Sequence, residues 1–189
     1  MDNQLDFNIA LQELIDTHSN EALHKLGSMV VDQLESHGIP IEEAHFILHD
    51  RDIDEDHKPK SLHVHYFLKS PDRFTFNQWS EGTGIESQFI GKVEGKGNTG
   101  RLNSLAYLIH IKYPDKYQYS PNNVVTIRGV DYSTIHAQNH DTWLKGRAVI
   151  SHSNALSKET EALVVDQILD GEVSYNELIL TKEGQLLNS

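Results

Sequence analysis

Residues 62–68 (LHVHYFL) alternate between two kinds of side chain, and this alternation constrains the fold more tightly than any other feature of the sequence. At the period of a β-strand, four apolar side chains point to one face, whereas His63 and His65 point to the other. The two imidazoles then stand about 6.6 Å apart along the strand, at roughly 3.3 Å per residue, so both rings can reach one metal ion. The alternative is a half-exposed strand that carries two histidines by chance, because 12 of the 189 residues are His.

The composition excludes several classes of protein. The chain has no Cys, which excludes disulfides, thiolate catalysis and cysteine-ligated zinc. No apolar run approaches the roughly 18 residues that a membrane-spanning helix needs, and the acidic start (MDNQLDF) does not resemble a signal peptide. We therefore expect a cytoplasmic protein that does not bind membranes, with one ordinary domain or a domain and a small appendage.

Charge is distributed unevenly along the chain. The formal net charge is −12 overall, which by itself argues against binding to nucleic acid. Residues 57–129, however, hold 10 basic and 5 acidic side chains, whereas residues 1–56 hold 2 basic and 14 acidic ones. The segment with a positive balance therefore contains the two histidines, and a locally positive surface can contact phosphate even on an acidic protein.

Hydrophobic periodicity predicts an order of elements that defines the fold class. The pattern predicts a strand at 5–11 (with helix as the competing interpretation), a helix at 19–37, strands at 44–49 and 62–69, a short helix at 74–81, a strand at 87–93 and a helix at 101–111. This order is typical of an α+β fold with a ferredoxin-like or RRM-like antiparallel sheet, helices on one face and the other face free for a site.

The remainder of the chain shows weaker patterns. Residues 124–128 are compatible with an edge strand, and residues 130–155 have no strong period. An amphipathic helix is predicted at 157–169 and a further short helix at 175–180. We therefore expect a main domain at 1–129, a linker or peripheral segment at 130–155, and a helical segment at 156–189.

His49, the last residue of the strand predicted at 44–49, and Asp52, in the turn that follows, extend the histidine pair. If strands 44–49 and 62–69 are neighbours, one register places His49 on the face of His63 and His65, and Asp52 lies in the following turn. Two or three imidazoles and a carboxylate suit Mn²⁺ or another divalent ion with open positions for a substrate. Each of the two added residues, taken alone, is more simply read as a solvated side chain.

Tyr107 and His110 share one face of the predicted helix at 101–111, because they are three residues apart. A phenol has a pKa near 10 and is a poor nucleophile at neutral pH. A cation that polarises a phosphate lowers the barrier to its attack. A tyrosine on a helix beside a metal site is therefore a coherent apparatus for cleaving a phosphodiester, although Tyr107 alone could be an ordinary boundary aromatic.

The combination of HDRD, HVH and, some forty residues later, YLIH resembles the HUH endonuclease superfamily, and within it the rolling-circle plasmid replication initiators, or Rep proteins. The resemblance covers roughly residues 40–128. It implies that residues 1–129 are an HUH nuclease and origin-binding domain, and that the helical segment at 156–189 serves oligomerisation or accessory DNA binding. It implies that His63 and His65 bind the divalent cation, Mn²⁺ or Mg²⁺, and that His49 and Asp52 are further ligands.

The same resemblance implies a nucleophile and a product. Tyr107 matches the tyrosine that forms a 5′-phosphotyrosine link and leaves a 3′-OH primer. Tyr113, Tyr117 and Tyr119 lie close by in the sequence and compete for this role, but they fall outside the helical motif. One tyrosine per site implies one nick, so closing the product needs a second subunit or another nucleophile.

We therefore expect a bacterial cytoplasmic initiator that binds an origin hairpin, nicks single-stranded DNA, forms a homo-oligomer and works with host replication proteins. A conjugative relaxase, a single-tyrosine transposase and a non-catalytic DNA-binding or adaptor domain are the alternatives. His110 is a candidate for supporting the metal ligands. The candidate DNA-binding residues are Lys92, Lys96, Arg101, Lys112 and Lys116, each of which could equally be a solvated surface cation.

Overall fold

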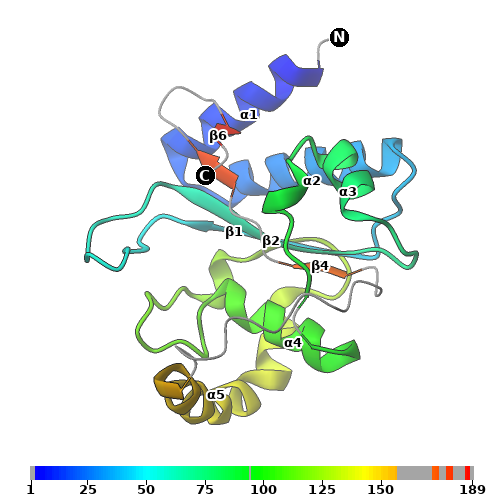
Figure 1. Cartoon of the computed structure of the whole chain (residues 1–189). Coiled ribbons are helices and arrows are strands. Elements are labelled where there is room, and N and C mark those ends of the chain that lie inside the picture. Colours follow the sequence, from blue (N-terminus) through cyan, green and yellow to red (C-terminus); the bar gives the residue numbers. More distant parts are fainter. Residues whose placement is uncertain (1–2, 94, 157–171, 175–177, 181–185, 188–189) are drawn as a thin grey trace.

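The computed structural model describes residues 3–93, 95–156, 172–174, 178–180 and 186–187 (Figure 1). In chain order the helices are α1 (Asn3–Thr17), α2 (Asn20–Ser36), α3 (Phe76–Thr83), α4 (Gly97–Leu108) and α5 (Tyr132–Leu156), with 3₁₀ turns η1 (Ser87–Phe89) and η2 (Pro121–Asn123). The strands are β1 (Glu43–His49), β2 (His63–Lys69), β3 (Val125–Arg128), β4 (Glu172–Ser174), β5 (Leu178–Leu180) and β6 (Leu186–Leu187). The α+β class with an antiparallel sheet is thereby confirmed.

The sheet is built around β1 and β2, which pair antiparallel along their whole length. Their register joins Glu43 to Lys69 at one end and His49 to His63 at the other. β3 pairs with the free side of β1, while β4 and β5 pair with β2, so the order is β3-β1-β2-β5-β6 with β4 also on β2. β1 and β2 are therefore interior strands of the sheet. All residues of β1 are buried, so other elements pack on both of its faces.

Helices cover both faces of this sheet. α1, α2 and α3 lie on one side, and α4 and α5 on the other (Figure 1). Alternate residues of β1 enter two separate cores: Phe46 packs with α1 and α2, whereas Ile47 packs with α4 and α5. The second face is therefore not left open, as the expectation of helices on one face implied, but is covered by the helix that carries Tyr107.

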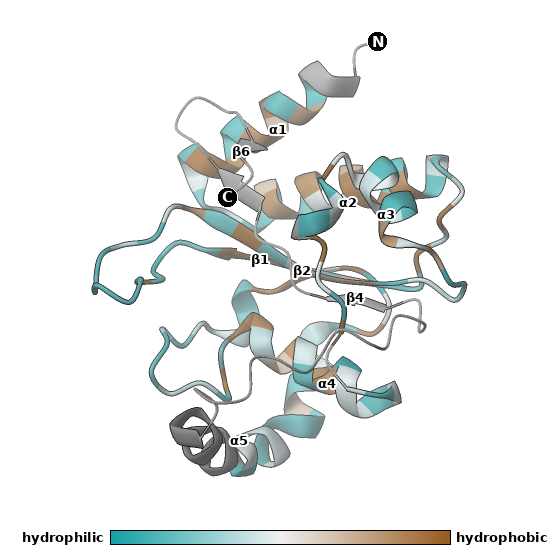
Figure 2. Ribbon diagram, in the orientation of Figure 1, coloured by the Kyte–Doolittle hydropathy of each residue, from teal (hydrophilic) through white to brown (hydrophobic). Residues whose placement is uncertain are grey.

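Local sequence explains where the helices begin and end. The side chain of Ser19 accepts a hydrogen bond from the backbone N–H of Ala22, which caps α2. Thr75 and Gln78 form a reciprocal capping box at the start of α3. Figure 2 shows hydrophobic colour on the strands and on the helices above them, whereas the loop between β1 and β2 is hydrophilic. Of the HDRD motif at the start of that loop, Asp50 and Arg51 are exposed, whereas His49 at the end of β1 is buried and Asp52 is partly buried.

Several predicted elements differ from the structure. Residues 5–11 belong to helix α1, the competing interpretation, because Ala10, Leu11 and Leu14 bury one helical face. In place of the strand predicted at 87–93, Ser87–Phe89 form a 3₁₀ turn and no named strand includes residues 90–93. Residues 132–156, which showed no strong period, form helix α5.

The C-terminal predictions are tested only in part. Leu178–Leu180 is a strand, so the short helix predicted at 175–180 is wrong for these residues. The amphipathic helix predicted at 157–169 lies outside the described residues. Among the helices that the structure describes, none is both long enough and apolar enough to cross a membrane.

Candidate functional site

Three histidines meet at one end of the β1–β2 pair. His49 and His63 are directly opposite each other in the register, and His65 lies two residues further along β2, opposite Ile47. All three imidazoles are buried, with 0 to 2% of each residue exposed. The predicted register is thus present, and it places His49 on the face of the histidine pair.

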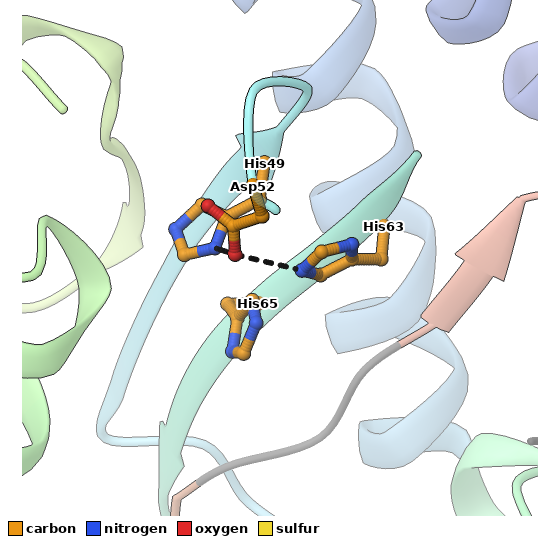
Figure 3. A group of neighbouring side chains, drawn as sticks. All are labelled: His49, Asp52, His63 and His65. Atoms are coloured by element: carbon orange, nitrogen blue, oxygen red, sulfur yellow. Dashed lines mark ion pairs between the residues drawn. The ribbon is translucent and has the colours of Figure 1, made fainter. Parts of the chain in front are cut away.

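Asp52 completes the cluster from the loop that follows β1. Its Oδ2 lies 3.3 Å from Nδ1 of His49 and 3.4 Å from Nε2 of His63. One potential ligand atom from each of His49, Asp52, His63 and His65 falls within 4.8 Å of the others. Figure 3 shows the three rings and the carboxylate converging from two strands and a loop. This arrangement could hold a metal ion, and we call it the His–Asp cluster.

Backbone carbonyls fix which nitrogens face inward. Nε2 of His49 donates a hydrogen bond to the carbonyl oxygen of Leu108 (2.7 Å), and Nδ1 of His63 donates to that of Ser61 (2.7 Å). A carbonyl oxygen can only accept, so each proton sits on the outward nitrogen, and a neutral ring directs its lone pair at Asp52. Orientation of ligand imidazoles by backbone carbonyls is typical of metal sites.

The inward-facing atoms need a positive charge between them. Nδ1 of His49 is buried and has no hydrogen-bond partner among the described residues, although a carboxylate oxygen lies 3.3 Å away. A lone pair and a carboxylate oxygen repel each other unless a proton or a cation lies between them. The donor set of imidazoles and one carboxylate suits a divalent cation such as Mn²⁺. The residues present therefore fit a metal ion.

The pKa of Asp52 reflects the same electrostatics. Burial opposes ionisation of this carboxyl, but hydrogen bonds and positive charge from the imidazoles of His49 and His63, present when protons rather than a metal ion occupy their inward nitrogens, outweigh burial and hold its pKa well below the usual range. For the neighbouring His110, a lowered pKa favours the uncharged form: burial, followed by positive charge on His49, lowers the pKa of His110 to about 4. At neutral pH the cluster therefore contains an ionised carboxylate beside a neutral His110.

Helix α4 brings Tyr107 to the edge of the His–Asp cluster. The ring centroid of Tyr107 lies 5.7 Å from that of His65 and 5.1 Å from that of His110. The ammonium of Lys116 donates a 2.6 Å hydrogen bond to the phenol oxygen and lies 4.8 Å from the ring centroid. Sequence reasoning placed Lys116 among the DNA-binding candidates, whereas the structure places it on the hydroxyl of Tyr107.

The other nearby tyrosines occupy different positions. Tyr119 stacks on His49 with ring centroids 4.2 Å apart, and its hydroxyl donates to Oδ1 of Asp52 (3.0 Å). Burial, reinforced by the charge of Asp52, raises the pKa of Tyr119 far above its usual value, so this phenol supports a ligand and is a poor nucleophile. Tyr113 lies beside Tyr107, with ring centroids 5.1 Å apart, and Tyr117 accepts a hydrogen bond from Arg51.

The loop after α4 carries these side chains back to the site. His110 adopts a left-handed backbone conformation (φ 58°), which ends the helix. Its Nδ1 donates to the carbonyl of Tyr117, and the backbone N–H of Tyr119 donates to the carbonyl of Ile109. These two hydrogen bonds close the loop, which places Lys116 on the hydroxyl of Tyr107 and Tyr119 on the ring of His49.

The remaining predicted DNA-binding residues do not form one group with the cluster. Arg101 makes two 2.6 Å hydrogen bonds to the buried carboxylate of Glu43, an ion pair that sequence reasoning missed. Lys112 donates to the side chain of Asn103. Lys96 is exposed just before α4, and Lys92 is partly buried after η1.

Comparison with known proteins adds one finding. A family model described as the origin-binding domain of plasmid replication proteins matches residues 23–133, which is more than half of the chain. The matched range contains the whole His–Asp cluster, Tyr107 and Lys116. No curated protein and no solved structure gives a significant match.

Proposed function

The chain belongs to the family of plasmid replication proteins through its origin-binding domain, and from this premise we propose that it initiates rolling-circle replication by nicking origin DNA. Membership of this family implies DNA binding and a role in plasmid replication. The proposal adds metal-dependent, site-specific cleavage by Tyr107, which is the chemistry of the HUH endonuclease superfamily that its motifs resemble. Closing the product with one tyrosine per site requires further copies of the chain or a second nucleophile.

In this proposal the His–Asp cluster holds the divalent cation. His49, His63 and His65 supply neutral nitrogens, and Asp52 supplies one negative charge, so the site retains a net positive charge when Mn²⁺ or Mg²⁺ binds. A cation held by these residues would act as a Lewis acid toward a DNA phosphate. Tyr119 and the carbonyls of Leu108 and Ser61 keep the ligands oriented.

Tyr107 performs the proposed cleavage. Its phenol oxygen forms a bond to phosphorus as the bond from phosphorus to the 3′ oxygen breaks, which leaves a 5′-phosphotyrosine and a free 3′-OH. The phenol proton passes to solvent, and the departing 3′ oxygen takes up a proton. Lys116 donates a hydrogen bond to the attacking oxygen, so its ammonium stabilises the negative charge that develops there as the proton leaves.

One observation carries the proposal: the buried Nδ1 of His49, which has no hydrogen-bond partner among the described residues, faces an ionised Asp52. The ring of His65 lies against both His49 and the lysine-bound Tyr107. A DNA-binding domain without chemistry needs no such cluster. An uncompensated acceptor pair destabilises a fold by about 1–3 kcal/mol for each unsatisfied group. A cluster of this kind beside a tyrosine is the arrangement that metal-assisted cleavage of a phosphodiester needs.

The proposal is tested by incubating the full chain with labelled random-sequence single-stranded DNA and Mn²⁺, followed by a denaturing gel. We expect a covalent adduct whose formation requires the metal, and peptide mapping should assign it to Tyr107. Tyr107→Phe should abolish the adduct, whereas Tyr113→Phe and Tyr117→Phe serve as matched controls that retain it. Sequence-specific binding to an origin hairpin without any adduct would instead identify a non-catalytic origin-binding domain.

A further inference from the structure

A cavity of about 290 Å³ adjoins the His–Asp cluster. It opens where α1, α2 and the end of β1 meet the segment 117–123. Tyr119 belongs to both features, because it lines the cavity while its ring stacks on His49 and its hydroxyl binds Asp52. A group bound in this cavity would therefore sit next to a phosphate held at the cluster.

The walls of the cavity combine flat apolar surface with polar edges. Leu23 and Leu48 line it together with Tyr119, and these side chains provide apolar surface. At its rim, Tyr117 is 39% exposed, and the guanidinium of Arg51 both binds the Tyr117 hydroxyl at 2.6 Å and lies 5.3 Å from its ring centroid. Aromatic rings and arginine planes of this kind are the surfaces on which unpaired bases stack.

A carboxylate in the same cavity restricts what can bind. Asp50 lines the cavity, and its Oδ2 lies 3.3 Å from Nδ1 of His18. A carboxylate repels a phosphate and accepts hydrogen bonds from N–H donors. The cavity is therefore better suited to the edge of a base than to the DNA backbone, even though the N-terminus of α2 and Arg51 are close by.

We propose that this cavity receives one unstacked base of the substrate strand, adjacent to the phosphate that Tyr107 attacks, and selects it through Asp50. The inference rests on the proposed function, because it assumes that single-stranded DNA is bound at the cluster. Adenine, cytosine and guanine carry an exocyclic amino group that can donate to the Asp50 carboxylate. Thymine offers only its N3–H, which lies between two carbonyl oxygens that a carboxylate repels, so the cavity discriminates against thymine at this one position.

The first test reads base preference directly. The full chain is incubated with Mn²⁺ and single-stranded DNA randomised around the cleavage site, and the strands captured as covalent adducts are sequenced. We expect thymine to be depleted about tenfold at one position next to the linked phosphate. Asp50→Asn should reduce that depletion to about twofold or less at this position only. Asp141→Asn, which changes an exposed carboxylate on α5, is the matched control and should retain the wild-type pattern.

The second test does not depend on cleavage. The Tyr107→Phe protein is bound to oligonucleotides that carry the fluorescent base 2-aminopurine at successive positions, and acrylamide is used to quench the fluorescence. We expect strong protection from acrylamide at the position identified by sequencing, because the base is enclosed in the cavity. Tyr117→Ala, made in the Tyr107→Phe background, should remove that protection by removing one stacking surface.

The outcomes separate this inference from the proposed function. If the wild-type chain forms no adduct with any sequence, the cleavage function itself is overturned. If adducts form but Asp50→Asn leaves the base preference unchanged, or weakens it equally at every position, the cavity does not select a base. Equal quenching of 2-aminopurine at all positions would likewise overturn the inference while leaving the cleavage function intact.

Discussion

Two buried polar clusters share one face of β1, and they differ in whether the protein satisfies their polar atoms. Glu43 and His45 lie at one end of the strand and His49 at the other, all on the side covered by α4. At the first end, Glu43 binds Arg101 through both oxygens, and His45 bonds to Glu43 and to Thr126. At the second end, Nδ1 of His49 has no hydrogen-bond partner among the described residues and lies 3.3 Å from a carboxylate oxygen of Asp52.

The difference shows that residue type alone does not identify a functional site. Both clusters contain a buried histidine and a buried or partly buried carboxylate, which are costly to bury unless they are paired. In the Glu43–Arg101 cluster, each group has its partner in the chain, so its role is to hold α4 against β1. In the His–Asp cluster, inward-facing acceptors lack a partner among the described residues, and the group could hold a metal ion.

The largest expected effect is the loss of metal-dependent chemistry from the His–Asp cluster. Replacing His63 and His65 together by Ala should lower the rate of adduct formation by roughly 10³-fold, about 4 kcal/mol in the barrier, because the cation no longer binds. Adduct formation on single-stranded DNA with Mn²⁺ measures this change. His45→Gln, in the other cluster, is the matched control and should change the rate less than about threefold. Equal losses from both variants would show that the two clusters do not differ.

The second effect concerns stability and belongs to the Glu43–Arg101 cluster. Arg101→Ala leaves the Glu43 carboxylate buried without its cation, and the free energy of unfolding should fall by about 3 kcal/mol. Urea unfolding, monitored by circular dichroism, measures this loss. Lys25→Ala breaks the exposed ion pair with Glu13 and should lower stability by less than about 1 kcal/mol. A loss no larger than that of the control would show that α4 is held in place by other contacts.

The stability that the Glu43–Arg101 cluster contributes should depend on pH. Burial opposes ionisation of Glu43, but His45 and Arg101 outweigh it and lower its pKa from 4.5 to about 2. A depressed carboxyl pKa stabilises the fold above the unfolded pKa, and this contribution is lost as the pH falls from about 4.5 to 2. It amounts to about 3 kcal/mol, at roughly 1.4 kcal/mol per pKa unit. The stability gap between wild type and Glu43→Gln should therefore narrow over this pH range in urea titrations. A gap that is constant with pH contradicts the assignment.

The smallest effect sharpens the role of Lys116 at the edge of the His–Asp cluster. Lys116→Met removes the hydrogen bond to Tyr107 but retains much of the side chain's length, and the rate of adduct formation should fall about tenfold. Binding of single-stranded DNA to the Tyr107→Phe protein, measured by fluorescence anisotropy, should change less than about threefold when Lys116→Met is added. A tenfold loss of affinity would show that Lys116 contacts phosphate instead. Lys112→Met is the matched control.

The sequence predicted the central part of the site because its signals are local. The alternation in residues 62–68 defined one face of β2, and the position of His49 at the end of a second alternating stretch predicted its place opposite that face. Asp52 followed from its distance of three residues along the chain. α2 and the pairing of β1 with β2 were predictable for the same reason, since helix capping and strand periodicity act over a few residues.

The remaining features depend on contacts between distant residues. Glu43 and Arg101 are 58 positions apart, and no periodic pattern connects them. Lys116 reaches Tyr107 because His110 ends α4 in a left-handed conformation and turns the chain back. The hydrophobic pattern did not predict helix α5, because its buried residues, Tyr132, Ile135 and Trp143, are widely spaced among polar residues. Packing, more than local preference, determines these features.

The residue that orients His49 is the immediate neighbour of the residue proposed to attack DNA. The carbonyl of Leu108 accepts a hydrogen bond from Nε2 of His49, and Tyr107 precedes Leu108 on the last turn of α4. A shift of that turn by one residue would swing the phenol away and, at the same time, let the imidazole rotate. The positions of Tyr107, the proposed nucleophile, and of His49, a proposed ligand, therefore both depend on residues 107–108. Insertions or deletions at this helix end should be far less tolerated than in the loop between β1 and β2.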